Sequence, residues 1–234
     1  MFCGKKKAVT FSYDDGVLQD RRTIDMLNQY GLKATFNINS GLLGLNRTLS
    51  FGADIGIVDH SSVKAEDVKY IYEGHEVAAH TLTHPLLPKQ TDEEVTRQVE
   101  EDRLALSEMV GYEVVGMAYP CGGVNNDDRV ARIIRETTGV QYARTITSTH
   151  SFELQDNLYR FNPTLHHDEA LKQLDFIETF LNTEFDAPAL LYIWGHSYEF
   201  DARKTWGAFE ELCHMLSGRQ DVFYGTNKEV FGLV

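Results

Sequence analysis

Short apolar runs alternate with longer segments of helical period along most of the chain, and this alternation restricts the fold more than any other feature. Such a pattern predicts a parallel sheet, either closed as a (β/α) barrel or open and doubly wound. Eight runs have the length and composition of strands, and they cover residues 8–13, 34–38, 76–79, 114–119, 140–146, 158–165, 189–194 and 222–224.

The spacing of these strands favours a distorted or incomplete (β/α) barrel over a regular one. Eight strands are crowded into 234 residues, and the piece between the fifth and sixth strands lacks a helical period. The segment from Gly41 to Ser62 also has no clear period and is expected to form a long loop with room for a short hairpin. Because no repeat or linker divides the chain, residues 1–234 are expected to form a single domain.

Composition excludes several classes of partner. The formal net charge of −13 argues against nucleic acid and anionic membrane, which both require basic patches. No apolar run reaches the ~18 residues of a membrane span, and no signal core opens the chain, so a cytoplasmic protein is expected. A secreted protein whose signal peptide has been removed would look the same. The three widely spaced cysteines predict neither a disulfide framework nor a thiolate zinc site.

Polar side chains stand where several predicted strands end. Asp14 and Asp15 end the first strand, although neighbouring carboxylates repel each other and are unfavourable in strands. Such a pair is typical both of a solvated turn and of a metal or catalytic site. The strand ends in a parallel α/β fold meet on one face, which carries the active site. Later strands end in His80, Tyr119, Pro120 and His196.

The stretch AHTLTH places His80 and His84 four residues apart, a spacing that in a helical turn lets two imidazoles hold one metal ion. A pair of surface histidines would show the same spacing. With one aspartate they form a facial triad with open positions for water. The second aspartate is then available as a general base, and His196 as a second proton-transfer group.

Together these residues resemble the polysaccharide deacetylase family, which includes chitooligosaccharide, chitin and peptidoglycan deacetylases. The first motif of the family, TFDDG, appears as TFSYDDG with two residues inserted, and its second, H-[ST]-x-x-[HS], matches HTLTH. AYPCGG replaces the third, Arg-Pro-Pro-Tyr-Gly, and Trp194-Gly195-His196 replaces the Leu-x-His of the fifth. The motifs occur in the order of the family, from about Val9 to His196.

The resemblance implies a distorted barrel that removes an acetyl group, N-linked or O-linked, from a sugar or oligosaccharide by means of metal-activated water. It implies that Asp14 is the general base, that His196 is the general acid, and that the backbone N–H of Tyr119 helps to hold the oxyanion. It also implies one divalent ion, with zinc as first choice and cobalt, nickel, iron or manganese as alternatives. The implied ligands are Asp15, His80 and His84.

In many members of the family, an arginine of the third motif pairs with the base aspartate. In this chain Ala118 or Met117 stands at that position instead. An arginine from a later strand is therefore expected to orient Asp14, with Arg160 as first choice and Arg144 as second. The fourth motif, built around Asp-Trp, is missing, and Glu199 in HSYEF has no counterpart. The residues expected to contact substrate are Trp194, Pro120 and Arg144.

Two other functions fit the same pattern. One is a related amidase acting on a cyclic amide or ureide, although such relatives often lose metal ligands. The other is a catalytically inert, carbohydrate-binding barrel, which would be expected to lose its base, its acid or its ligands. All five candidate residues are present here.

Overall fold

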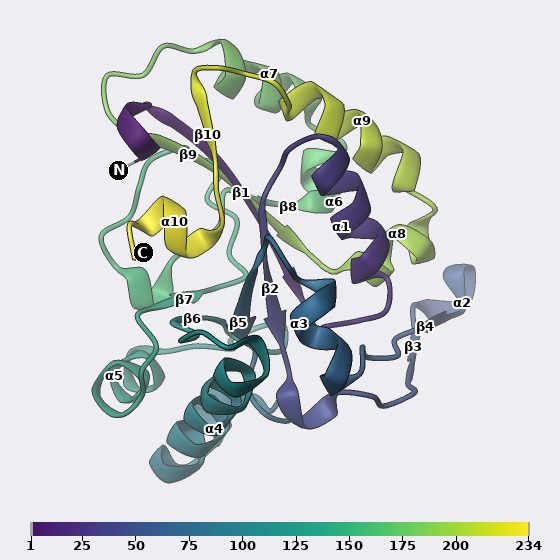
Figure 1. The fold of residues 1–234 in the computed structure, drawn as a ribbon, viewed down its shortest axis with the longest axis vertical. Helices are drawn as coiled ribbons and strands as arrows, with labels where there is room; N and C mark the ends of the chain where they lie inside the picture. Colours follow the sequence, from purple (N-terminus) through teal and green to yellow (C-terminus); the bar gives the residue numbers. More distant parts are fainter. Residues whose placement is uncertain (1, 234) are drawn as a thin grey trace.

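The computed structural model describes residues 2–233, which form an eight-stranded sheet with the strand order β7-β6-β5-β2-β1-β9-β8 and with β10 paired to β1 (Figure 1). Every ladder in this sheet is parallel, as the alternation of strands and helices predicts. The strands are β1 (Lys7–Asp14), β2 (Ala34–Ile38), β5 (Glu76–Ala79), β6 (Gly116–Ala118), β7 (Tyr142–Arg144), β8 (Leu165–His166), β9 (Ala189–Gly195) and β10 (Val222–Tyr224).

The sheet curls into an incomplete barrel, which confirms the predicted fold class. Its edge strands β7 and β8 share no ladder. The predicted strand over residues 158–165 is largely wrong, because Leu158–Arg160 forms a 3-10 turn and only Leu165 of that range enters β8. Pro163 lies between these pieces and has no N–H with which to continue a ladder.

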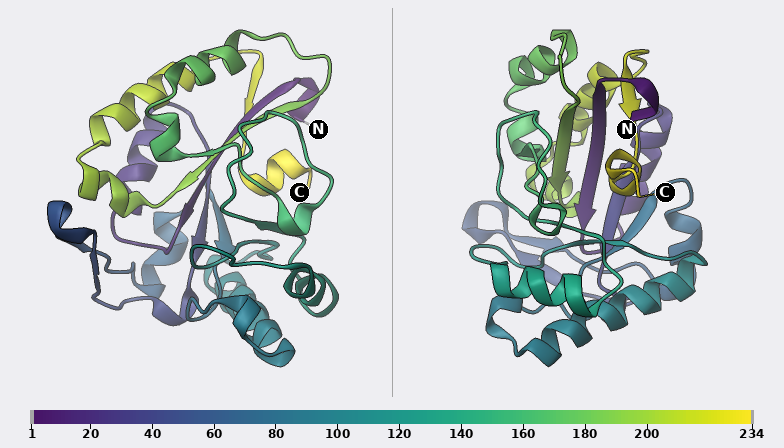
Figure 2. Two further views of the ribbon diagram at one scale, coloured as in Figure 1. Left: turned by 180° about the vertical axis from the view of Figure 1, so that it is seen from behind. Right: turned by 90° about the vertical axis from the view of Figure 1, so that its left-hand side faces the viewer.

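Helices cover the outer face of the curled sheet as an arc, whereas α10 lies within the curl (Figure 1). In the further views of Figure 2, the beginning of the chain and α10 again lie close together, and Phe2 and Val230 belong to one buried cluster. No helix within residues 2–233 has the length and apolarity needed to cross a membrane. The helices are α1 (Asp20–Gln29), α2 (Gly52–Ile55), α3 (Val68–Ile71), α4 (Asp92–Val110), α5 (Asp128–Thr137), α6 (His167–Ala170), α7 (Leu174–Asn182), α8 (Ser197–Arg203), α9 (Trp206–Leu216) and α10 (Asn227–Phe231).

Strand β1 is buried on both faces, and the two faces have different chemistry. Phe11 and Tyr13 pack against aromatic rings of α8 and α9. The alternate residues are polar: Thr10 donates a hydrogen bond to Asn227 of α10, and Ser12 accepts one from Asn37 of β2. Because side chains alternate along a strand, Asp14 continues this polar row. The aspartate is therefore part of a buried hydrogen-bonded interior.

The segment from Gly41 to Ser62 contains the predicted short hairpin. Its strands β3 (Thr48–Ser50) and β4 (Ile57–Asp59) pair antiparallel, and α2 connects them. Arg47, just before β3, and His60, just after β4, both line the pocket described below. The hairpin therefore supplies part of one wall of that pocket.

Candidate active site

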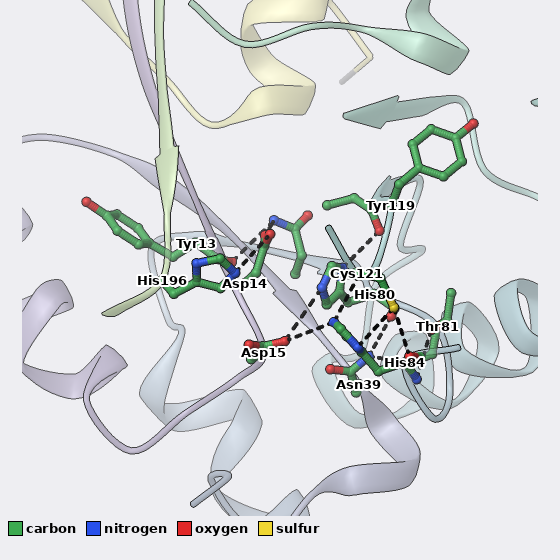
Figure 3. Close-up of polar contacts among 12 residues, drawn as sticks. Tyr13, Asp14, Asp15, Asn39, His80, Thr81, His84, Tyr119, Cys121 and His196 are labelled. Atoms are coloured by element: carbon green, nitrogen blue, oxygen red, sulfur yellow. Dashed lines mark hydrogen bonds and ion pairs between the residues drawn. The ribbon is translucent and has the colours of Figure 1, made fainter. Parts of the chain in front are cut away.

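The predicted polar residues meet at the carboxyl ends of the parallel strands. Asp14 ends β1, His80 directly follows β5, and His196 directly follows β9. They line a pocket with a volume of ≈ 450 Å³, which lies in the usual range for small-molecule sites. Figure 3 shows the side chains of this group facing one another. Of the residues predicted for the site, the pocket wall includes Asp14, Asp15, His80, His84, Tyr119, Trp194 and His196.

Asp15, His80 and His84 form a group suited to one metal ion. The Asp15 Oδ1 atom lies 3.6 Å from His80 Nε2 and 3.5 Å from His84 Nε2 (Figure 3). His80 Nδ1 lies 2.9 Å from the carbonyl oxygen of Ala118, which can only accept a hydrogen bond. The proton of this ring therefore sits on Nδ1, and the Nε2 lone pair faces Asp15, as in metal sites with an ordered outer shell. One carboxylate and two imidazoles fit zinc and similar transition metals.

The two histidines converge without the helical turn expected from their spacing, so that part of the prediction is wrong. The backbone has positive φ at Thr81 (69°) and at His84 (59°). Neighbouring polar groups hold this irregular loop in place. Asn39 Nδ2 donates hydrogen bonds to the carbonyl oxygens of His80 and Thr81, and the Asp102 carboxylate of α4 accepts one from the His80 N–H. The loop is therefore fixed before any ion binds.

The charge state of this group also suits metal binding. Burial by itself raises the pKa of Asp15, but a hydrogen bond with His60 and the nearby charges of other histidines hold that pKa well below its usual range. The His60 Nε2 atom lies 3.0 Å from Asp15 Oδ2. Burial lowers the pKa of His84 to about 4. An ionised carboxylate and a neutral imidazole are the forms that bind metals.

Asp14 has a different set of partners from its neighbour Asp15. The Nη2 atom of Arg144 lies 2.5 Å from both of its carboxylate oxygens, and Asn37 Nδ2 lies 2.8 Å from Oδ1. Arg144 is completely buried. His196 Nε2 lies 4.0 Å from Asp14 Oδ2, across the mouth of the pocket. The two adjacent aspartates are thus held by different partners.

Arg160, the first choice for orienting Asp14, is a wrong prediction. Its guanidinium instead binds Asn126 at 2.8 Å and Asp128 at 2.5 Å, on the surface beside α5. The reason is the 3-10 turn at Leu158–Arg160, which replaces the expected strand and carries Arg160 away from the strand ends. Arg144, at the end of β7, takes the orienting position. Because Arg144 is buried and does not line the pocket, its assignment as a substrate contact is also wrong.

The backbone N–H of Tyr119 is not available for an oxyanion, contrary to the prediction. It donates a hydrogen bond to the carbonyl oxygen of Arg144 at 2.9 Å. The N–H of Cys121, a residue of the pocket wall, donates a hydrogen bond to His84 Nε2 at 3.4 Å, in a turn where Cys121 has φ 69°. Pro120 is buried and does not line the pocket, so it is not a substrate contact. Trp194 does line the pocket, with the Arg144 guanidinium 4.6 Å from its ring centre.

Glu199 holds His196, a relation that sequence reasoning missed. Its Oε2 atom lies 3.2 Å from His196 Nδ1. Burial by itself lowers the pKa of His196, but this hydrogen bond and the negative charges nearby outweigh burial and raise it to about 9. The available sequence signal was a glutamate three residues after the histidine that follows a strand. Asn37 at a predicted strand end was a second missed signal, whereas nothing in the loop sequence singled out His60.

Residues 3–143 match the family model described as polysaccharide deacetylase, and the chain belongs to this family. A curated relative is the peptidoglycan-N-acetylglucosamine deacetylase PgdA of Listeria monocytogenes, 30% identical over 121 residues. That match covers 51% of this chain and 22% of PgdA, so the matched half of the chain spans about a fifth of the length of this relative.

Solved structures share the fold at low sequence identity. The Xyl-CE4 domain of a multidomain xylanase from the hindgut metagenome of Trinervitermes trinervoides has a TM-score of 0.60 at 18% identity, covering 97% of this chain and 91% of that one. A family 4 acetyl xylan esterase from Clostridium thermocellum, solved with cobalt, has a TM-score of 0.58 at 13% identity with the same coverages. A CE4 family pseudoenzyme from Bacillus anthracis has a TM-score of 0.53 at 17% identity, covering 96% and 65%. The fold alone therefore does not establish activity.

Proposed function

We propose that this protein is a metal-dependent hydrolase that releases acetate from an acetylated sugar or oligosaccharide. Membership of the polysaccharide deacetylase family supports carbohydrate deacetylation in general. The observation that carries the specific proposal is the separation of the two adjacent aspartates. Asp15 faces two imidazole nitrogens, whereas Asp14 is held by Arg144 and stays off the ligand group. One carboxylate is thus assigned to a metal and the other to proton transfer.

Asp15, His80 and His84 would hold the ion, with zinc as first choice on the basis of the donor set. A divalent ion bound there lowers the pKa of a water molecule and polarises the acetyl carbonyl. The fixed Nδ1 proton of His80 and the anionic Asp15 are properties of the chain that prepare the site for this ion.

The remaining residues have distinct roles in hydrolysis. Asp14, oriented by Arg144, takes a proton from the water that attacks the acetyl carbon. The Cys121 N–H, which here donates to His84 Nε2, would be free to donate to the developing oxyanion once that nitrogen binds the ion. Comparable donors contribute about 2.7–4 kcal/mol where they have been removed. His196, kept protonated by Glu199, then gives its proton to the leaving nitrogen or oxygen as the bond to the acetyl carbon breaks. The products are acetate and a free amine or hydroxyl.

The substrate is an acetylated sugar or oligosaccharide, and N-acetyl and O-acetyl groups both suit this chemistry. The relatives carry both kinds of name, a peptidoglycan-N-acetylglucosamine deacetylase and an acetyl xylan esterase. Trp194 offers the pocket an apolar aromatic surface of the kind that packs against a sugar ring or an acetyl methyl group.

The test is acetate release from a panel of N-acetyl and O-acetyl sugars, with and without a chelator. Wild type should release acetate only when metal is present, and Asp14→Asn should lose about 10²–10⁴-fold in rate because its general base is gone. Asp128→Asn is the matched control, since the Asp128 side chain is 95% exposed. A protein that binds metal and sugar but releases no acetate would show an inert barrel. Turnover of cyclic amides without turnover of acetyl sugars would favour the amidase.

A further inference from the structure

We propose that His166, His167 and Glu199 form a second site for a divalent transition metal ion, separate from the Asp15 group. His166 ends β8, His167 begins α6, and Glu199 lies in α8, just after β9. Strands β8 and β9 are neighbours in the sheet. An ion here would therefore join the carboxyl ends of two adjacent strands. The proposal does not depend on deacetylase activity.

The three ligand atoms are spaced like the donors of a tetrahedral metal site. Glu199 Oε2 lies 3.0 Å from His166 Nε2 and 3.1 Å from His167 Nε2, and all three atoms lie within 4.8 Å of one another. Donors at the usual metal distances of about 2.0–2.2 Å are separated by roughly 3.3–3.6 Å at tetrahedral angles. The three side chains are thus already close to the arrangement that an ion requires.

His167 provides the independent evidence for a ligand. Its side chain is 0% exposed. Nδ1 has no hydrogen-bond partner within residues 2–233, and Nε2 lies 3.1 Å from Glu199 Oε2 without the alignment of a good hydrogen bond. Leaving such a buried polar group without a partner is unfavourable. Both atoms lie where an ion between them would contact each of them, and such an ion would give His167 Nε2 a partner.

The ring of His167 cannot turn away to find another partner. It packs against Phe200 with ring centres 4.4 Å apart. On its other edge is Gly195, where an added Cβ atom would lie 2.3 Å from His167 Nδ1. Packing on both sides therefore fixes the orientation in which the Nε2 atom of His167 faces Glu199.

Arg203 holds one carboxylate oxygen each of Glu199 and Asp168 and leaves the other oxygen of each near the proposed site. Its Nη1 atom binds Glu199 Oε1 at 2.9 Å and Asp168 Oδ2 at 3.0 Å. The other oxygen of Asp168, Oδ1, lies 3.5 Å from His167 Nε2, beside the proposed site. His196 Nδ1 also contacts Glu199 Oε2, and a hydrogen bond from an outer partner to a metal-bound carboxylate is common. Arg203 therefore acts as an outer clamp on the anionic ligands.

The donor set selects the class of ion. Two imidazoles with carboxylate oxygens suit zinc, cobalt or nickel. Calcium and magnesium prefer sites made of oxygen ligands alone. The proposed ligand is therefore a zinc-like ion, and Zn²⁺ and Co²⁺ are the appropriate probes.

The experiment counts metal ions bound per chain, and it begins with a variant that lacks the first site. His80→Ala/His84→Ala removes two of the ligands of the Asp15 group. After equilibrium dialysis against Zn²⁺, wild type should hold two equivalents and this double variant one. With Co²⁺ the double variant should show the visible absorption of a tetrahedral ion. These measurements do not use activity, so failure of the deacetylase proposal would leave them unaffected.

Further substitutions in the double-variant background locate the remaining ion. Adding His167→Asn should remove the bound equivalent and the Co²⁺ absorption, and His166→Asn should do the same at a more exposed position. Adding His150→Asn is the matched control, because His150 pairs with Glu169 on the surface and should leave the ion in place. Circular dichroism identifies any variant that fails to fold. A double variant that binds no ion, or an ion that survives both His166→Asn and His167→Asn, overturns the proposal.

Discussion

Arg144→Met is the most informative single substitution, because it tests which arginine supports Asp14. The guanidinium of Arg144 is fully buried and contacts both carboxylate oxygens of Asp14, the Ser12 hydroxyl and the carbonyl oxygen of Thr145. Methionine preserves most of the volume but leaves Asp14 as a buried charge without its ion-pair partner. Breaking a buried pair in this way costs about 3–5 kcal/mol of unfolding free energy.

The assay is urea and thermal unfolding followed by circular dichroism. For a chain of this size, a loss of about 3–5 kcal/mol lowers Tm by roughly 6–20 °C. Arg160→Met is the matched control, since its partner Asp128 is an exposed carboxylate. Exposed pairs contribute about 0–1 kcal/mol, so this variant should unfold close to wild type.

Adding Asp14→Asn to Arg144→Met tests the cause of the loss. The double variant no longer buries an unpaired charge, so it should recover part of the lost stability, with a coupling energy of about 0.5–3 kcal/mol between the two sites. The reasoning is refuted if Arg144→Met and Arg160→Met are equally stable, or if Asp14→Asn brings no recovery in the Arg144→Met background.

Two further predictions follow from particular contacts. Burial lowers the pKa of His196, but Glu199 raises it to about 9. His196 should therefore lose its proton, and acetate release should fall, only as pH rises through about 9. In Glu199→Gln this fall should move to lower pH, and an unchanged pH profile of kcat/KM would contradict this role for Glu199. In Gly116→Ala the new Cβ atom would meet the Tyr142 ring at 2.1 Å, which should cost about 1–3 kcal/mol in urea unfolding. Gly207→Ala, where a Cβ atom meets nothing within 4 Å, should cost nothing, and equal stability of the two variants would show that Tyr142 moves aside.

Much of the fold was predictable because local sequence carries the signal for strands. The predicted ranges 34–38, 76–79 and 222–224 coincide with β2, β5 and β10. These strands are apolar runs bounded by polar residues or turns, so burial and local pattern agree. The prediction failed at residues 158–165, where Leu158–Arg160 forms a 3-10 turn and Phe161 forms only an isolated bridge with Arg144.

The sequence predicted which residues form the candidate site, but not which of them contact one another. The rule that parallel strand ends meet on one face placed Asp14, Asp15, His80 and His196 in one pocket. It contains no information about which arginine reaches Asp14, because both candidates lie more than a hundred residues away along the chain. That choice depends on the register of β7 and on the turn that carries Arg160 outward.

By itself, the sequence determined the parallel α/β architecture, the family resemblance and the group of residues that gather at the strand ends. Periodicity and single motifs are patterns of a few neighbouring residues, and the order of the motifs is read directly along the chain. None of these signals requires coordinates. Only the tertiary structure decided that Arg144 holds Asp14, that the Cys121 N–H reaches His84, and that Glu199 holds His196. Each of these contacts brings side chains or backbone groups from different elements, or from the two sides of a turn, within a few ångströms of each other. Such distances follow from sheet curvature, strand register and turn geometry, which the whole packed chain sets together.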